Sequence, residues 1–153
     1  MKKLLVALLL VAVMFGCSGG TKDVTKKGIF QTPAGDDGSY ATAEVTLVND
    51  KITEVSIDAF HASAGAFKKA LGEDYGMRGA SPIGKEWFEQ IAALEQWMIG
   101  KTIEEVMAMP VYAKDDNHKS VPDSEDLKTS VTIDVGASLE AVKGAVDAAT
   151  VVE

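Results

Sequence analysis

The chain has 153 residues, of which 15 are basic and 23 are acidic, so its formal net charge is -8. This length has room for one domain and a targeting segment rather than for two domains. Lys2 and Lys3 are the only charged residues before Cys17, so the rest of the chain is more acidic still, with Arg78 as its single arginine. Nucleic-acid binding normally requires a basic surface, and this composition therefore argues against a nucleic-acid partner.

The N-terminus has the pattern of a secretory signal peptide. Met1, Lys2 and Lys3 form a positively charged start, and an uninterrupted apolar run from Leu4 to Phe15 follows. A stable transmembrane helix needs roughly 20 apolar residues, and this run is shorter. We therefore predict a signal peptide over residues 1–16 that is removed on export.

Cys17 follows the apolar run and is the only cysteine of the chain. Residues 14–20, Met-Phe-Gly-Cys-Ser-Gly-Gly, resemble a bacterial lipobox, in which the cysteine is linked to diacylglycerol before cleavage. The alternative is a free or buried thiol, and a lone cysteine cannot form an intramolecular disulfide. Two acyl chains anchor a protein stably. We predict lipidation at Cys17, a flexible tether over residues 17–27, and a domain over residues 28–153 on the extracellular face of the cytoplasmic membrane.

The first part of the predicted domain has the pattern of antiparallel strands. Residues 40–48 alternate, with Ala41, Ala43, Val45 and Leu47 on one parity. Asn49, Asp50 and Lys51 form a tight connection, and apolar residues continue as far as Ala59. We predict a hairpin over residues 40–59 and a short strand over residues 28–31.

Helical patterns dominate the rest of the chain. Residues 62–71 predict a short helix, and residues 82–99 predict the strongest one, with Ser81 as N-cap, Pro82 at the first position and an apolar face made by Ile83, Trp87, Ile91, Leu94 and Met98. A capping box at Thr102 to Glu105 predicts a helix over residues 103–109. Residues 129–135 predict a strand, and residues 138–149 predict a last helix. The fold class we expect is α+β, a small antiparallel sheet packed with helices.

Several catalytic chemistries lack their motifs in this sequence. There is no G-x-G-x-x-G, no Walker P-loop and no G-x-S-x-G. The two histidines, His61 and His118, lie in separate segments, which makes a metal site or a hydrolytic triad improbable. The segment from Asp126 to Ser138 instead places hydroxyl groups just before a predicted helix start, where a phosphate is favoured. An ordinary cap or turn is the alternative.

Three stretches carry a resemblance to a known family. Asp37-Gly38-Ser39-Tyr40 with the following hairpin resembles the start of the FMN-binding domain of exported bacterial flavoproteins. Residues 75–107 and residues 126–133 resemble FMN-binding-domain surface lipoproteins of Gram-positive bacteria, including the pheromone-encoding lipoprotein A type. The resemblance covers residues 28–149.

This resemblance implies a covalent cofactor. In such proteins a flavin transferase uses FAD to attach FMN, through its phosphate, to a hydroxyl in the pattern D-x-x-[ST]-G-A-[ST]. Asp126, Thr129 and Thr132 match this pattern, whereas Ser130 stands in place of Gly and Val131 in place of Ala. The resemblance therefore implies that Thr132 is the acceptor.

The spacing alone does not select Thr132. A looser form of the pattern, D-x-x-T-x-V-[ST], also occurs from Asp50 to Ser56, inside the predicted hairpin. Thr132 is favoured because it precedes the last helix, as the family arrangement requires. The alternative for Thr132 is a polar residue on the solvent-facing side of a strand.

A bound flavin would also need contacts to its ring and a positive charge. We consider Trp87, Phe88, Trp97, Tyr75 and Met77 as ring contacts, although Trp87 also fits a core position of its helix. Lys85 is the residue that we expect to stabilise an anionic ring or the phosphate.

The functional expectation is therefore an extracellular electron carrier. It would pass electrons between membrane redox proteins and extracellular acceptors, with no substrate turnover of its own. The alternative is a flavin-free surface lipoprotein that binds a ligand or a partner. The resemblance also suggests that the signal peptide, whose tail is residues 10–16, is released as a peptide pheromone.

Overall fold

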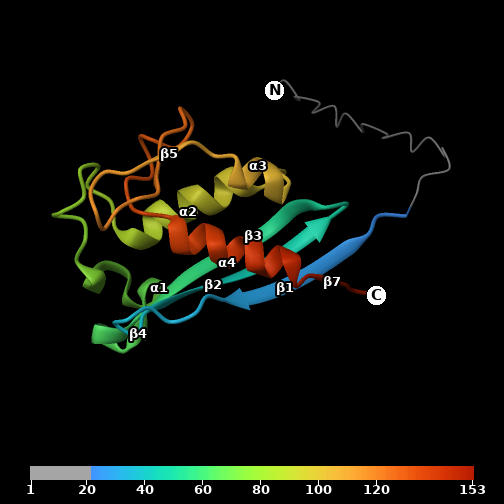
Figure 1. Ribbon diagram of the computed structural model, residues 1–153, viewed down its shortest axis with the longest axis horizontal. Coiled ribbons are helices and arrows are strands. Elements are labelled where there is room, and N and C mark those ends of the chain that lie inside the picture. The colour runs from blue at the N-terminus through green and yellow to red at the C-terminus, as the bar shows by residue number, and fades with distance from the viewer. Residues whose placement is uncertain (1–21) are drawn as a thin grey trace, which may run out of the picture.

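The computed structural model describes residues 22–153, which form a mixed α+β domain (Figure 1). A five-stranded antiparallel sheet has the order β4-β3-β2-β1-β7, and β5 and β6 form a second, two-stranded sheet. The strands are β1 (Thr25–Gln31), β2 (Tyr40–Val48), β3 (Lys51–His61), β4 (Ala66–Phe67), β5 (Val111–Tyr112), β6 (Val121–Pro122) and β7 (Thr150–Val151), and the α-helices are α1 (Lys68–Leu71), α2 (Trp87–Met98), α3 (Ile103–Met107) and α4 (Gly136–Asp147). The predicted α+β class is confirmed.

The predicted hairpin forms the centre of the large sheet. β2 and β3 pair along their length, and the turn between them places Asn49 and Asp50 at φ values of 52° and 63°. Two consecutive left-handed residues are what a tight hairpin turn requires, and Asn and Asp tolerate this conformation. The alternation in β2 is also confirmed, because its four apolar residues on one parity are buried.

Within residues 22–153, helices cover one face of the large sheet and not the other. α4 packs against β1 and β2, and α2 contacts β3. In Figure 1 both helices lie on the same side of the sheet. The core lies between these layers and combines the inner residues of β2 and β3 with the apolar stripes of α2 and α4. The described residues therefore contain their own hydrophobic core.

β1 begins earlier than expected and lies very close to α4. It starts at Thr25, so residues 25–27, which we predicted as tether, pair with β2 and belong to the sheet. A Cβ atom added at Gly28 would lie 1.9 Å from the carbonyl oxygen of Ala145. Gly28 is therefore required by the close approach of β1 and α4.

The start of α2 differs from the prediction. The helix begins at Trp87 rather than at Pro82, and Glu86 rather than Ser81 is its N-cap. Residues 81–84 form a turn in which Gly84 adopts a φ of 63° and its N–H donates to the carbonyl of Ser81. This left-handed residue interrupts the helical path. The predicted apolar stripe from Trp87 to Met98 is buried, as expected.

The predicted strand over residues 129–135 does not exist. Val131, Ile133 and Val135 are buried in alternation, as predicted, but the segment joins no sheet. The N–H of Val131 instead bonds the carbonyl of Leu127, and the N–H of Val135 bonds the carbonyl of Ser120. Alternating burial requires only an extended backbone between packed layers, not a neighbouring strand.

The other predicted elements are present with shifted bounds. β1 extends the expected strand over residues 28–31, and residues 62–71 split into a 3-10 turn at Ala62–Ala64, β4 and α1. α3 ends at Met107 and keeps its capping box, and α4 begins at Gly136 instead of residue 138. The predicted signal peptide and Cys17 lie outside the described residues. Between residues 22 and 153, no helix has the length and hydrophobicity needed to cross a membrane.

Candidate functional site

Thr132 lies in the wall of a cavity of about 440 Å³ near the start of α4. We call it the Thr132 cavity. Its wall comes from three parts of the chain: α1 and the segment after it, the turn before α2 together with the start of α2, and the segments that precede α4. The lining residues are Lys68, Tyr75, Met77, Ala80, Ser81, Pro82, Trp87, Lys114, Asn117, His118, Thr132, Ile133 and Asp134.

Gln90 fixes Thr132 in this wall. Its side chain is fully buried, and its Oε1 accepts a hydrogen bond from the backbone N of Thr132 at 2.8 Å and one from the Thr132 hydroxyl at 3.3 Å. The Gln90 amide nitrogen donates to the Ser81 hydroxyl at 3.2 Å and to the Lys85 carbonyl at 3.3 Å. Gln90 therefore ties the Thr132 segment to the turn before α2.

A lysine and two aromatic rings form another part of the wall. The Nζ of Lys68 lies 4.8 Å from the ring centre of Tyr75 and 5.3 Å from that of Trp87. Both distances are within the range of a cation–π interaction. Trp87 is 6% exposed, so it is a core residue that also borders the cavity. This arrangement holds a positive charge between two apolar surfaces.

Glu86 orders the loop that contributes Met77. Its side chain is 2% exposed, and its two carboxylate oxygens accept hydrogen bonds from the backbone N of Met77 at 2.8 Å and of Arg78 at 2.9 Å. A buried carboxylate is stable only with such partners. The N-cap of α2 therefore also sets the position of one side of the cavity.

Asp134 connects the cavity to the start of α4. One carboxylate oxygen accepts the N–H of Gly136 at 2.9 Å, and the other accepts the N–H of Ser120 at 2.7 Å. The first bond satisfies a donor at the helix N-terminus, and the second holds the preceding loop. The N-cap residue of α4 is Val135, and the carboxylate of Asp134 supplies the side-chain hydrogen bond at this helix start.

The loop after β5 reaches the cavity through Lys114, Asn117 and His118. His118 Nδ1 lies 2.7 Å from an Asp115 oxygen, and the hydrogen bond from His118 holds the pKa of the Asp115 carboxyl below its usual value, with a further contribution from the backbone N–H of Asn117. The pair closes a local turn at the edge of the cavity.

A second cavity of about 390 Å³ adjoins the first and shares Lys68, Trp87 and Asp134 with it. We call it the Tyr40 cavity. Tyr40 stacks on Phe60, with ring centres 5.1 Å apart and an interplanar angle of 16°. Its other lining residues are Thr32, Pro33, Gly35, Ser39, Ala41, Ala59, Ala137, Ser138 and Glu140.

The predicted site residues are only partly brought together. Trp87, Tyr75 and Met77 line the Thr132 cavity, whereas Lys85, Phe88 and Trp97 do not. Lys68, rather than Lys85, lies beside the rings of Tyr75 and Trp87. Thr129 lines a different hollow, of about 520 Å³, which Thr132 also borders. Asp126 is exposed and Ser130 half-buried, both within the turns at residues 125–130.

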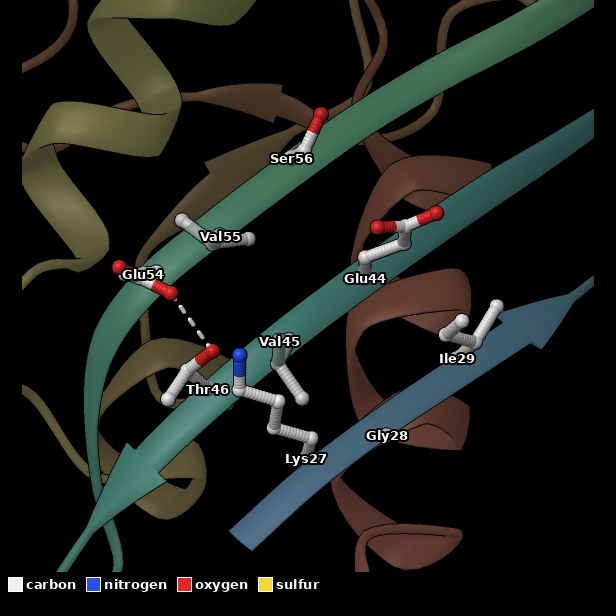
Figure 2. A pocket seen from close by; sticks show the side chains of 9 residues that line it. All are labelled: Lys27, Gly28, Ile29, Glu44, Val45, Thr46, Glu54, Val55 and Ser56. Carbon is white, nitrogen blue, oxygen red and sulfur yellow. Dashed lines mark hydrogen bonds between the residues drawn. The ribbon is translucent and has the colours of Figure 1, made fainter. Parts of the chain in front are cut away.

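Ser56, the alternative acceptor, lies on the opposite face of the large sheet. It is exposed in β3 and borders a shallow hollow with Glu44 and Ile29. In Figure 2 the Ser56 and Glu44 side chains stand on the face that points away from α4, which passes behind the sheet. The same view shows the Thr46 hydroxyl bonded to Glu54 at 2.8 Å. No aromatic ring lines this hollow.

Sequence reasoning missed Lys68, Gln90, Glu86 and Asp134. A signal exists for Gln90, because it is a polar residue on the apolar side of α2, between Trp87 and Ile91. Lys68 carried no such signal, since its position next to Trp87 depends on how α1 folds back on the sheet. Within residues 22–153, no group of three His, Cys, Asp or Glu side chains is arranged to hold a metal ion.

Comparisons with known proteins identify no family. No protein-family model matches the chain. A chlorophenol reductase from Desulfitobacterium hafniense is 46% identical over 39 residues, which is 26% of this chain and 12% of that protein. The chain thus spans about an eighth of the length of this relative. A solution NMR structure of a protein from Clostridium thermocellum is 21% identical, covers 83% of this chain and 91% of its own, and has a TM-score of 0.44.

Proposed function

We propose that this chain is a lipid-anchored extracellular flavoprotein that carries FMN on Thr132 and acts as an electron carrier. The observation that carries the proposal is the position of the Thr132 hydroxyl, which shares a cavity wall with Trp87, Tyr75 and Lys68. The alternative acceptor, Ser56, has no aromatic neighbour of this kind in its hollow. The family resemblance of residues 126–133 supports the same hydroxyl.

The residues of the cavity fit a flavin phosphoester. Cofactor pockets usually measure about 300–1,000 Å³ and combine apolar walls with a few polar groups. The Thr132 cavity has about 440 Å³, two aromatic rings, a methionine and two lysines. Lys68 would stabilise negative charge on the ring or phosphate, and Trp87 and Tyr75 would exclude water from one side.

Attachment would leave the surrounding hydrogen bonds largely intact. A transferase that uses FAD would join the Thr132 oxygen to the FMN phosphate, release AMP and remove the hydroxyl proton. The ester oxygen could no longer donate to Gln90, but Gln90 Oε1 would keep the shorter bond from the Thr132 backbone N. No buried group would therefore lose its last partner.

FMN supplies the one-electron and two-electron chemistry, and the protein's part would be to hold it outside the cell. A covalent tether prevents loss of the cofactor to the medium and keeps its local concentration high. Membrane redox proteins are the donors that we propose, because the predicted anchor at Cys17 would hold the domain beside them.

The test is covalent flavin incorporation. The chain from Ser18 onward is coexpressed with a flavin transferase, denatured and examined for flavin fluorescence in the gel. We expect fluorescence in the wild type, its loss in Thr132→Ala and its retention in Thr132→Ser. Ser56→Ala is the matched control and should remain fluorescent.

Three results would contradict the proposal as stated. A wild-type band without fluorescence would exclude covalent flavin. Loss in Ser56→Ala instead of Thr132→Ala would move the attachment to the hairpin. Flavin that copurifies but washes off on denaturation would indicate a noncovalent site.

A further inference from the structure

His118 is the histidine in the wall of the Thr132 cavity, and it belongs to the loop between β5 and β6. Histidine is the side-chain type that ordinarily changes its charge between about pH 5 and about pH 8. The other titratable groups that line the cavity are Lys68, Tyr75, Lys114 and Asp134. Lysine and tyrosine ordinarily titrate at about pH 10, and aspartate at about pH 4. His118 is therefore the lining residue suited to exchange a proton at neutral pH.

Asp115 determines which nitrogen of His118 exchanges this proton. Nδ1 of His118 lies 2.7 Å and 2.8 Å from the two carboxylate oxygens of Asp115. One of these oxygens also accepts the backbone N–H groups of Asn117 and His118, both at 2.9 Å. The hydrogen bond from the His118 ring, followed by the one from Asn117, holds the pKa of the Asp115 carboxyl below its usual value. An ionised carboxylate only accepts hydrogen bonds, so Nδ1 keeps its hydrogen and Nε2 gains or loses the proton.

Nε2 of His118 is placed to exchange its proton with water. The hydrogen bonds of the ring to other side chains within residues 22–153 are made by Nδ1, which leaves Nε2 on the opposite side of the ring. The His118 side chain is 48% exposed, so water reaches the ring of a residue that also lines the cavity. Water also screens the interactions of the ring with other charges, and we expect effects of a few-fold.

The charges around the cavity respond to a negative charge that enters it. Lys68 from α1 and Lys114 from the same loop are positive, and Asp134 before α4 is the carboxylate among the lining residues. Both oxygens of Asp134 accept backbone N–H bonds. A negative charge at Thr132 would favour the protonated form of a nearby histidine, because opposite charges attract. The lysines keep their charge at neutral pH, so the change in protonation falls on His118.

We infer that Nε2 of His118 is a proton site coupled to charge at Thr132, and that it takes up a proton when negative charge enters the cavity. With FMN bound as proposed, the added charge is the electrons that the donor delivers, and one proton moves from water to Nε2. Asp115 is the positioning residue, since it holds the ring in the Nδ1–H form. The redox part rests on the proposed function, whereas the coupling between His118 and Thr132 does not.

The first test uses the flavin-free chain from Ser18 onward and follows the ring nitrogens by nitrogen-15 NMR between about pH 5 and about pH 8. We expect Nε2 of His118 to lose its proton as the pH rises and Nδ1 to stay protonated. Thr132→Glu, compared with Thr132→Gln, should favour protonated His118 about twofold or more, the effect of a unit charge at close range in water. His61 does not line the cavity, so it is the internal control and should titrate equally in both variants.

A change at Asp115 tests the positioning role. The side chain of Asp115→Asn can accept a hydrogen bond from Nδ1 or donate one to it, so the neutral ring should lose its preference for the Nδ1–H form. Asp116→Asn changes the neighbouring residue and should leave the form of the ring unchanged.

The second test uses the flavin-loaded chain and measures its midpoint potential against pH. The potential of the wild type should fall more steeply with rising pH than that of His118→Gln, because only the wild type takes up a proton at residue 118 on reduction. His61→Gln is the matched control and should keep the wild-type slope.

Three results would overturn the inference. One is loss of the proton from Nδ1 of His118 instead of Nε2 as the pH rises. Another is the same His118 titration in Thr132→Glu and Thr132→Gln. The third is an equal pH slope of the potential in the wild type and in His118→Gln. A chain without flavin fluorescence in the gel contradicts the proposed function, and the first two results then decide the inference by themselves.

Discussion

At the scale of single residues, the candidate site depends on buried polar groups with defined partners. Gln90 accepts a hydrogen bond from the backbone N–H of Thr132, and Glu86 accepts those of Met77 and Arg78. Asp134 accepts the N–H of Gly136, the first residue of α4. Each of them orders one part of the wall around Thr132. Gln90 therefore holds Thr132, the acceptor that we propose, in a wall whose other parts are ordered by Glu86 and Asp134.

Gln90 provides the clearest test of this point. Gln90→Leu keeps an apolar side chain of similar length in the core but removes the acceptor for the Thr132 N–H. A buried unsatisfied donor costs about 1–3 kcal/mol, and we expect the free energy of unfolding in urea to fall by that amount. Gln96→Leu, an exposed change on the same helix, should alter it by less than about 0.5 kcal/mol. Equal effects of the two changes would contradict the role assigned to Gln90.

The Asp115–His118 pair predicts a pH effect at the edge of the Thr132 cavity. The hydrogen bond from His118 lowers the pKa of Asp115 in the folded protein. A lowered pKa adds stability above the unfolded value, and this stability is lost as the pH falls through the folded value. In an NMR titration, the carboxyl carbon of Asp115 should titrate below the usual Asp range, and His118→Ala should move its pKa upward. The neighbouring Asp116 is the internal control, and an unchanged Asp115 in the variant would refute the coupling.

At the scale of elements, close packing on β1 sets the position of α4 against the large sheet. Gly28 packs against the backbone of Ala145, and Gly144 packs against the ring of Phe30. A Cβ atom added at Gly144 would come within 2.3 Å of that ring. The two glycines allow the helix and the strand to approach each other. Both contacts lie in the last turns of α4, which they hold against β1.

Gly28→Ala should therefore destabilise the whole domain. Its Cβ would meet the Ala145 backbone at 1.9 Å, which forces α4 away from the sheet. Overpacking of this kind costs about 1–3 kcal/mol or more, and a lower midpoint of thermal unfolding is the expected result. Gly79→Ala is the control, because nothing lies within 4 Å of the added atom. The importance of the contact would be disproved if the two variants melted at the same temperature.

At the scale of the whole molecule, the acidic composition and the predicted anchor bear on how the domain meets its partners. The formal charge of -8 favours a donor that presents a basic surface, since opposite charges speed up encounter. None of the described helices covers one face of the large sheet, and the two cavities lie on the helical side.

The anchor itself is testable without reference to the flavin. Cells that express the full chain are grown with labelled palmitate, and the membrane fraction is analysed. We expect the label in the wild type and its absence in Cys17→Ala, because Cys17 is the only cysteine available for acylation. Ser18→Ala, the neighbouring change, should remain labelled. Label in Cys17→Ala would place the acyl chain elsewhere.

The sequence by itself determined the α+β class, the hairpin with its Asn-Asp turn, and the buried stripe of α2, because these follow from local periodicity and turn chemistry. It also singled out Thr132 and Trp87. Only the tertiary structure decided that residues 129–135 are extended without a strand partner, that α2 starts at Trp87, and that Lys68 instead of Lys85 faces the aromatic rings. These features depend on contacts between segments far apart in the chain, and local sequence patterns do not specify such contacts.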